Sequence, residues 1–380
     1  QFSRKGYQTK YIEVHVKVFL VVQMDISPFE LGEVVVHANQ IPTSRKNAIA
    51  STEIVTKKDI AWGDDTNIAE PLNRVPEVFV QSGALNTNRF TIRGIGSRNL
   101  FGTSKIRAYF KDIPLTNGSG ETTIEDFELA AISRVEILKG ATNTIYGAGS
   151  GGTIQLTPQD ASLAETSVVP QFAAGSYSLF KTAINFNIGH QKNSYRAVYS
   201  NTHSDGYCDN NQYNRQTFTI TSSHFINPKN SLTTFVSLVD LKAFIPSSLS
   251  EDDFINSPTS VAFTWGNAKG FEDSKCAIFG LTWDYRYTQN SKQVASVFGS
   301  LRKGYEPRPF NILEENTAAY GIRSRFLGKI KKLKHIIGFE YFKDNYISKT
   351  FENLYQDFPP ETGSVQGVLL SDFKENRRYY

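Results

Sequence analysis

The stretch that decides the fold runs from Arg134 to Leu156 and reads RVEILKGATNTIYGAGSGGTIQL. Its first part, with Val135, Ile137 and Leu138, has the composition of a strand, and a second strand pattern follows the glycine-rich run 147–152. Glycine tolerates positive φ and the close approach of a neighbouring backbone, so we expect tight packing there. Helix and strand patterns alternate before this stretch, whereas only strand and turn patterns follow it. The stretch is therefore predicted to join two unlike folds.

The glycine-rich run contains Gly147, Gly149 and Gly152, which together satisfy the dinucleotide-binding fingerprint GxGxxG. That fingerprint requires a helix directly after it, so that a pyrophosphate meets the helix N-terminus. Residues 153–158, TIQLTP, are instead β-prone and end in proline. We therefore expect these glycines to serve packing, and we do not expect a nucleotide site.

The bulk composition narrows the class of protein. The 380 residues exceed one ordinary core, so at least two domains are expected. The net charge of +4, from 41 basic and 37 acidic residues, predicts no nucleic acid partner. Aromatic residues make up 13% of a chain whose mean hydropathy is only −0.34, which is typical of strands that face lipid on one side and water on the other. A soluble β-sandwich would give a weaker form of this signal, and no apolar run reaches the roughly 20 residues of a spanning helix.

No catalytic or metal-binding pattern emerges from the sequence. The six His are scattered, and none lies four positions from another with a Glu, as a zinc hydrolase requires. No nucleophile elbow occurs around any Ser. The two Cys, Cys208 and Cys276, lie far apart in the sequence and could pair only if the fold brings them together. We expect a protein that is not an enzyme and has no metal site.

The N-terminal residues 1–31 contain two strand patterns of period two and are expected to be the end of a small β-domain. Met24 is the only methionine and no signal peptide precedes it, so we expect the chain to begin within a longer protein. The next segment, 33–38, reads EVVVHA and follows Gly32. Such a strand could add itself to the sheet edge of another protein, or could be one more strand of the preceding domain.

Between residues 49 and 158 short helix and strand patterns alternate, as in a small globular domain. One helix is predicted to begin after Thr56, and a second, 67–73, is predicted to be capped by Asp65 and Thr66. Further predicted elements are three strands and a short helix: 78–80, 90–94, 106–110 and 125–131. Predicted loops are the polar segments 81–88, 96–104 and 115–123.

From Ala164 onward apolar and polar residues alternate with a period of two, as in 281–288 and 336–341, and about ten such strands fit. Predicted short turns at 191–193, 227–230, 289–291 and 328–333 alternate with predicted longer connections at 205–212, 244–275, 303–316 and 345–367. A transmembrane β-barrel has this asymmetry, with tight turns on one side and long loops on the other. A soluble sandwich has no reason to keep it, so we predict antiparallel barrel strands.

Five motifs in a fixed order resemble the plug domain of TonB-dependent outer-membrane receptors. They are Ile92-Arg93-Gly94, Lys111-Asp112-Ile113-Pro114, the run 134–141, Ile145-Tyr146-Gly147 and Gly151-Gly152-Thr153-Ile154. The sequence departs from the family pattern at two positions: Lys111-Asp112 stands where the family has Asp-Gly, and Ala141 replaces a proline. Neither departure removes a chemical group, and Asp tolerates the left-handed geometry that glycine usually takes in this turn.

The resemblance implies a fold class and four segments. An α+β plug domain would be followed by antiparallel transmembrane β-barrel strands, about ten of the roughly 22 in a complete barrel, so the chain would be C-terminally incomplete. Residues 1–31 would be the end of a carboxypeptidase-regulatory-like β-domain, a small remnant, and residues 32–48 the TonB box with a linker. Residues 49–158 would form the plug, and residues 159–380 the N-terminal part of the outer-membrane barrel.

The resemblance also implies site residues. The TonB box would be Glu33, Val34, Val35, Val36, His37 and Ala38. Ligand contacts from the plug loops would be Asn86, Asn88, Arg98, Asn99 and Asn117, with Tyr207, Trp265 and Phe271 as weaker candidates in the barrel loops. Amide side chains suit an oxygen-rich ligand and a guanidinium suits an anion, although solvated loops without a ligand role are an alternative. Arg93, Arg134 and Glu136 would pair with the barrel wall and act as a latch.

The function implied by the resemblance is TonB-dependent import of a ferric siderophore or a ferric citrate-like chelate across the outer membrane of a Gram-negative bacterium. The loop sequences 97–102, SRNLFG, and 117–122, NGSGET, resemble the iron-chelate branch of the family. Partners would be TonB with its inner-membrane energising complex, the chelate, and outer-membrane lipid, with the plug facing the periplasm. Iron would travel only within the chelate, without a resident cofactor. Alternatives are a receptor for oligosaccharide or cobalamin, and a non-transporting barrel such as an adhesin or a truncated product.

Overall fold

The computed structural model covers residues 1–380 and describes residues 22–23, 35–36, 38, 43–44, 48, 50–64, 66–83, 85, 88–97, 105–117, 122, 124, 127–140, 142–147, 149–159, 163 and 166–380. The chain divides into two compact units, residues 1–49 and residues 50–380. In the first unit, β1 (Val35–Val36) pairs antiparallel with β2 (Thr43–Ser44). Glu33, Val34 and His37 of the predicted TonB box lie outside the described residues, as does segment 1–31 apart from 22–23.

We call residues 50–159 the small-sheet region, after a five-stranded sheet in the order β3-β8-β9-β6-β7. Its strands are β3 (Ser51–Thr56), β6 (Ile106–Phe110), β7 (Ile113–Pro114), β8 (Ile132–Lys139) and β9 (Gly152–Pro158). β6 and β9 run parallel, and the other neighbours run antiparallel. A separate hairpin consists of β4 (Val78–Ser82) and β5 (Asn88–Ile92). The described helices are α1 (Lys57–Ala61), α2 (Ala69–Asn73), α3 (Asn143–Tyr146) and a 3₁₀ turn, Leu129–Ala131.

Local sequence accounts for the starts of the two larger helices of this region. The helix predicted near Thr56 is present as α1, and Thr56 caps it through a reciprocal capping box with Asp59. The cap predicted for α2 is wrong, because the backbone N–H of Ala69 donates to Asn67 Oδ1 at 2.9 Å. Thr66 instead donates its own N–H to Asp64 Oδ1 at 2.8 Å. The helix therefore begins two residues later than the predicted 67–73.

The stretch Arg134–Leu156 forms two antiparallel strands, β8 and β9, with α3 between them. Gly152 lies at the start of β9 with a φ of +142°, and a Cβ there would come within 2.3 Å of the Leu138 carbonyl oxygen. Only glycine fits such a backbone approach without distortion. A strand, not a helix, follows the glycines, so the packing role predicted for them is confirmed and the pyrophosphate geometry is absent.

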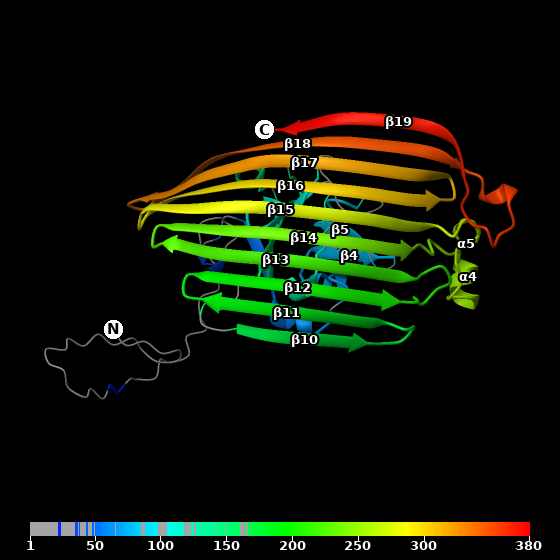
Figure 1. Cartoon of the computed structure of the whole chain (residues 1–380), viewed down its shortest axis with the longest axis horizontal. Helices are drawn as coiled ribbons and strands as arrows, with labels where there is room; N and C mark the ends of the chain where they lie inside the picture. The colour runs from blue at the N-terminus through cyan, green and yellow to red at the C-terminus, as the bar shows by residue number, and fades with distance from the viewer. Residues whose placement is uncertain are drawn as a thin grey trace. The chain divides into compact units, whose positions relative to one another are not determined.

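The remaining strands form one antiparallel sheet of ten strands, which we call the large sheet (Figure 1). In chain order they are β10 (Thr166–Ala174), β11 (Phe180–His190), β12 (Asn193–Ser204), β13 (Tyr213–Asn227), β14 (Asn230–Phe244), β15 (Phe271–Thr288), β16 (Ser291–Arg308), β17 (Asn311–Ile330), β18 (Leu333–Asn353) and β19 (Gln366–Tyr379). Each strand pairs with the next in the sequence, so the order is a simple meander. The prediction of about ten antiparallel strands is confirmed.

Connections at the two ends of the large sheet differ in length, as predicted, with one exception. Tight turns at 191–192, 228–229, 289–290 and 331–332 lie at one end, which we call the turn end. The opposite, loop end carries 175–179, 205–212, 245–270 with the helices α4 (Glu251–Asn256) and α5 (Phe263–Ala268), and 354–365. The long connection predicted at 303–316 is wrong, because β16 and β17 continue to a tight turn at 309–310. Charged residues in this segment suggested a loop, but they occupy a ladder that extends in unbroken register from Ser291↔Gly328 to Arg308↔Asn311.

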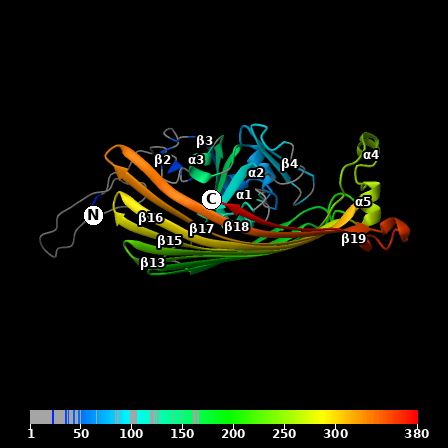
Figure 2. The same ribbon diagram turned by 90° about the horizontal axis from the view of Figure 1, so that it is seen from above.

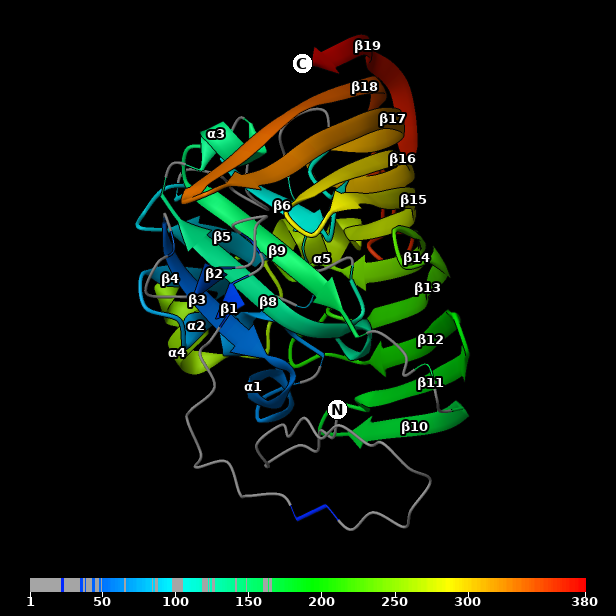
Figure 3. The same ribbon diagram turned by 90° about the vertical axis from the view of Figure 1, so that its left-hand side faces the viewer.

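The two faces of the large sheet have different environments. Its inner face packs against the small-sheet region, where Phe110 stacks on Phe235 of β14 with ring centroids 4.0 Å apart. A Cβ built on Gly280 of β15 would lie 2.3 Å from the Ile113 side chain, so the two regions approach closely. Figure 2 shows the large sheet curving around the small-sheet region, and Figure 3 shows β8 and β9 against its concave side. Both regions therefore share one core.

The outer face of the large sheet carries a band of exposed apolar side chains. Leu238, Phe279, Val297 and Ile322 belong to it, with exposed fractions between 39% and 50%. Nearer the turn end, Trp283 and Tyr285 stack with ring centroids 5.4 Å apart. Alternation of buried and exposed residues along each strand places these side chains on the face opposite the core. None of the described helices is both long and apolar enough to cross a membrane.

Candidate functional site: the interface between the small-sheet region and the large sheet

Only two of the five predicted plug-loop ligand residues are described. Asn86, Arg98 and Asn99 lie outside the described residues. Asn88 is the first residue of β5 and is only 4% exposed, beneath the large sheet near Tyr213 and Arg215. Its position as an open loop residue was therefore predicted wrongly, because β5 begins earlier than the sequence suggested. Asn117 is half-buried after β7, and its ligand role stays a prediction.

The three weaker candidates all lie near the loop end. Tyr207 is 47% exposed and makes an edge contact with Tyr177, with ring centroids 5.4 Å apart. Trp265 lies on α5, and its ring packs beside Gly270. Phe271 packs between Phe244 and Tyr305.

Phe271 occupies the outer face of β15. Gly280, nine positions along, faces inward onto Ile113, and alternate residues of a strand point to opposite faces. Phe271 therefore points away from the inner side of the sheet, and its ligand role stays a prediction.

The predicted latch residues have ionic partners within the small-sheet region. Arg93 pairs with Glu77 at 2.9 Å, and both side chains are nearly half exposed. Arg134 and Glu136 pair with each other along β8 at 2.7 Å. Arg93 therefore does not bind the wall as predicted, because its φ of +53° ends β5 and turns its side chain toward Glu77.

A buried carboxylate, Glu128, joins the small-sheet region to the large sheet. Its Oε1 lies 2.9 Å from Nζ of Lys181 on β11, and both side chains are at most 5% exposed. Its Oε2 accepts a hydrogen bond from Ser200 on β12. Two residues along, the Ala130 carbonyl accepts a hydrogen bond of 2.9 Å from Arg196, also on β12. Three wall residues thus hold one short segment of the small-sheet region.

The charge state of Glu128 follows from these neighbours. Burial by itself would raise the pKa of the Glu128 carboxyl, but the positive charges of Lys181 and Arg215, with the hydrogen bonds from Lys181 and Ser200, hold it below its ordinary value. The carboxylate is therefore ionised at neutral pH. A buried ion pair of this kind becomes costly when one partner is removed, because the other charge stays buried.

A second charged contact lies at β17 and β18. Arg107 Nη1 is 3.0 Å from Glu340 Oε1, and the Tyr109 hydroxyl donates to Glu340 Oε2 at 3.3 Å. The Arg323 guanidinium lies 4.4 Å from the centroid of the Tyr109 ring, a cation–π contact. Arg107 and Tyr109 belong to β6, so this cluster holds that strand of the small sheet against the wall.

Asp112 forms a third contact, an ion pair with Arg325 of β17. From the resemblance to the plug motif, Asp112 was expected to be a turn residue that replaces glycine. The left-handed residue is instead Lys111, with a φ of +51°, which leaves Asp112 to supply a charge to the wall. This departure from the family motif therefore adds a chemical group to the interface.

Sequence reasoning missed Glu128, Lys181, Asp112 and Glu340 as contact residues. The contacts of Lys181 and Glu340, which lie on strands of the large sheet, could have been predicted from the sequence. A charged side chain at an inward position of an alternating strand must contact water or a partner. No such periodicity marks Glu128, which directly precedes the 3₁₀ turn Leu129–Ala131 and caps it.

The interface between the small-sheet region and the large sheet is held by packing and ionic contacts. Within the described part of the chain, no group of three or more His, Cys, Asp or Glu side chains could hold a metal ion. Cys208 and Cys276 are both free thiols. The contacts instead combine stacked aromatic rings with buried ion pairs across two regions that do not share a sheet.

Comparison with known proteins gives a consistent assignment. Residues 44–154 match the TonB-dependent Receptor Plug Domain family. Among solved structures, the chain is similar to the ferric citrate transporter FecA in its unliganded form, with 16% identity and a TM-score of 0.68 over 88% of this chain and 52% of FecA. It is also similar to the pyoverdine outer membrane receptor FpvA from Pseudomonas aeruginosa PAO1 bound to pyoverdine, with 15% identity and a TM-score of 0.72 over 90% of this chain and 55% of FpvA.

A third similar structure is the siderophore receptor PiuA from Acinetobacter baumannii, with 15% identity and a TM-score of 0.64 over 87% of this chain and 53% of PiuA. At these identities the likeness establishes the fold. The chain spans about half the length of each of the three receptors.

Proposed function

We propose that this chain, which contains a TonB-dependent receptor plug domain and has the fold of such receptors, serves in the uptake of a ferric siderophore or a ferric citrate-like chelate across an outer membrane. The observation that carries this proposal is the position of the plug, which is the small-sheet region. It lies on the inner face of the barrel sheet, held there by the buried Glu128–Lys181 pair. A plug that is bound through a few breakable charged contacts suits a gate.

The outer face of the sheet supports the membrane setting. An exposed apolar band covers the middle of the strands, and aromatic side chains such as Trp283 and Tyr287 follow it toward the turn end. Bands of this kind, flanked by aromatic residues, suit the hydrocarbon core and the interface of a bilayer. The loop end would then face the outside, and the turn end the periplasm.

The proposed ligand class rests on the similar structures and on the loop sequences. Those structures are of a ferric citrate transporter, a siderophore receptor and a pyoverdine receptor. Exposed Tyr207, with Tyr177 beside it, could cover an apolar part of such a chelate at the loop end. An oligosaccharide or cobalamin receptor is the second candidate, because aromatic side chains also stack on such ligands.

The proposed energy coupling depends on the segment around β1. Val35 and Val36 form only a two-residue ladder with Thr43 and Ser44. So short a pairing can be exchanged for a strand of TonB, which would add its own backbone hydrogen bonds to the same residues. Replacing Val35 with proline removes a donor from that ladder, whereas Val35→Thr keeps it.

Growth under iron starvation tests the function. A strain that lacks the gene, complemented with the full gene or with V35P or V35T, is supplied with single defined chelates. We expect the full gene and V35T to restore growth on one ferric chelate, and V35P to abolish it at an unchanged level of receptor in the membrane. Growth on every chelate without the gene would contradict the ligand class, and full growth with V35P would contradict the TonB coupling.

A further inference from the structure

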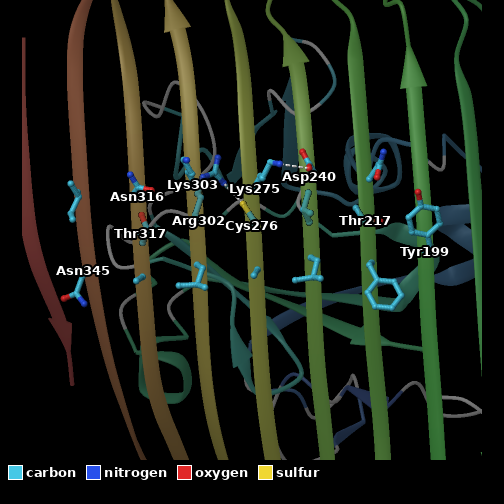
Figure 4. A pocket seen from close by; sticks show the side chains of 18 residues that line it. Tyr199, Thr217, Asp240, Lys275, Cys276, Arg302, Lys303, Asn316, Thr317 and Asn345 are labelled. Carbon is cyan, nitrogen blue, oxygen red and sulfur yellow. Dashed lines mark hydrogen bonds and ion pairs between the residues drawn. The ribbon is translucent and has the colours of Figure 1, made fainter. Parts of the chain in front are cut away.

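A groove lies on the outer face of the large sheet, at the border between the apolar band and the loop end (Figure 4). Its cavity volume is about 720 Å³. Figure 4 shows Asp240, Lys275, Lys303 and Asn316 in a line across neighbouring strands, at the edge of the groove that is nearer the loops. No part of the proposed uptake mechanism uses this surface, because it faces away from the plug.

The four edge residues are direct neighbours in the sheet. Asp240 pairs with Lys275, Lys275 with Lys303, and Lys303 with Asn316, so the row crosses β14, β15, β16 and β17. Neighbouring strands lie about 4.8 Å apart, which lets two lysine amino groups reach one anion. Lys275 contacts Asp240 at 3.1 Å, and both side chains are more than half exposed. Lys303 is exposed, and within the described part of the chain it has no ionic partner.

The row one step nearer the loops differs from this arrangement, although like charges also face each other elsewhere in the sheet, as at Lys329↔Lys334 and Lys343↔Arg378. There Lys242 faces Asp273, and Glu314 faces Lys349, so the charges lie opposite unlike charges. Like charges directly opposite each other destabilise a sheet. The cross-strand pair Lys275–Lys303 therefore leaves an excess of positive charge that an external anion would neutralise.

The floor of the groove is apolar. Two positions nearer the turn end, Leu238, Ala277, Leu301 and Ala318 are again direct neighbours across the same four strands. Small Ala277 lies between two leucines that are about half exposed, so a channel runs below the lysines. A molecule that fills this groove must present an anion at the lysines and hydrocarbon below them.

We propose that Lys275 and Lys303 bind the phosphate of a phosphorylated lipid in the leaflet at the loop end, with an acyl chain lying over Ala277. Asp240 competes with the phosphate for Lys275 and so limits the affinity. This inference rests on the proposed membrane setting of the receptor. It assigns a lipid site to the outer face, separate from the chelate and from the plug.

The test uses the purified receptor that contains this chain, placed in phosphatidylcholine vesicles with a small fraction of lipid A, a phosphorylated glycolipid. Native mass spectrometry of the extracted receptor counts the lipid A that stays bound. We expect K275Q/K303Q to lower lipid A binding about tenfold or more, since each lysine near an anionic membrane surface contributes about 1 kcal/mol. We expect D240N to raise the binding, because it frees Lys275.

Matched variants separate charge from shape. K329Q/K334Q removes the other cross-strand lysine pair, Lys329↔Lys334 near the turn end, and should leave lipid A binding unchanged. A277F keeps both lysines but fills the channel, and should lower the binding. Vesicles with lipid A stripped of its phosphates should show no difference between the native receptor and K275Q/K303Q.

Equal lipid A binding by the native receptor and by K275Q/K303Q would overturn the proposal, as would an equal loss in K329Q/K334Q. Binding that inorganic phosphate displaces completely would show an anion site without the lipid, which also contradicts it. Chelate binding is measured on the same samples by tyrosine fluorescence quenching. Lysine-dependent lipid binding without chelate binding would contradict the proposed function but support the lipid site. Chelate binding without lysine-dependent lipid binding would contradict the lipid site but support the proposed function.

Discussion

The inner and outer faces of the large sheet are built from the same strands, yet their ion pairs differ in exposure to solvent. On the inner face, Lys181 is 5% exposed and is matched to a carboxylate of the plug. On the outer face, Lys275 is 67% exposed, and its Asp240 partner is open to solvent as well. A charge removed from water needs a fixed partner, whereas an exposed one is stabilised by solvent. We therefore expect the buried pairs to contribute more to plug binding than the exposed ones contribute to the outer face.

The largest expected effect comes from breaking a buried pair. Lys181→Met keeps most of the side-chain volume but leaves the Glu128 carboxylate buried without its main partner. We expect the free energy of unfolding to fall by about 3–5 kcal/mol. Urea titration of the purified receptor in detergent, followed by near-ultraviolet circular dichroism, measures it. Lys275→Met on the outer face is the control, and an equal loss in both variants would contradict the difference between the faces.

A smaller effect is expected from the aromatic contact of the two regions. Phe235 on the inner face is 3% exposed and stacks on Phe110, whereas Phe279 on the outer face is 49% exposed. Phe235→Ala should lower the free energy of unfolding by about 3 kcal/mol because it leaves a cavity in the shared core. Phe279→Ala should cost less than about 1 kcal/mol in the same titration. Similar losses for the two variants would show that the sheet does not pack on the plug through this face.

The pH dependence should be the smallest of the three effects. The pKa of Glu128 is held below its ordinary value in the folded protein, so its contribution to stability is complete above the unfolded value of about 4.3. That contribution is lost as the pH falls through the lower, folded pKa. Unfolding free energies measured from neutral pH down to about pH 3 should therefore decline less steeply for Glu128→Gln than for the native receptor. An identical decline for the two proteins would mean that the positive charges of the large sheet do not lower the pKa of this carboxyl.

The sequence predicted the large sheet better than the contacts that it makes. Alternation of period two is a local property, so about ten strands and the turn end at 191–192 or 331–332 could be predicted. The connection at 309–310 could not be predicted, because charged and polar residues in an extension of two strands look like a loop. The strand pairing that keeps them ordered comes from neighbours far along the chain.

The plug was identifiable from the spacing of its motifs, but its partners were not. Arg93 lies in the most recognisable motif, yet its left-handed backbone directs it to Glu77 within the plug. Glu128 lies in no motif, and its partner Lys181 follows more than fifty residues later. The ion-pair partners depend on how the plug packs against the large sheet. No local pattern in a single sequence indicates that arrangement.

The proposed uptake requires the plug to move against the inner face of the sheet, and a reversible cross-link tests this claim most directly. A Cβ on Gly280 would lie 2.6 Å from Ile113 Cγ1, which places the two Cβ positions within reach of a disulfide. I113C/G280C is made in a background with Cys208→Ser and Cys276→Ser. We predict that the disulfide forms, that it stops chelate uptake while chelate binding persists, and that a reductant restores uptake. Uptake at the native rate by the fully cross-linked receptor would contradict the claim.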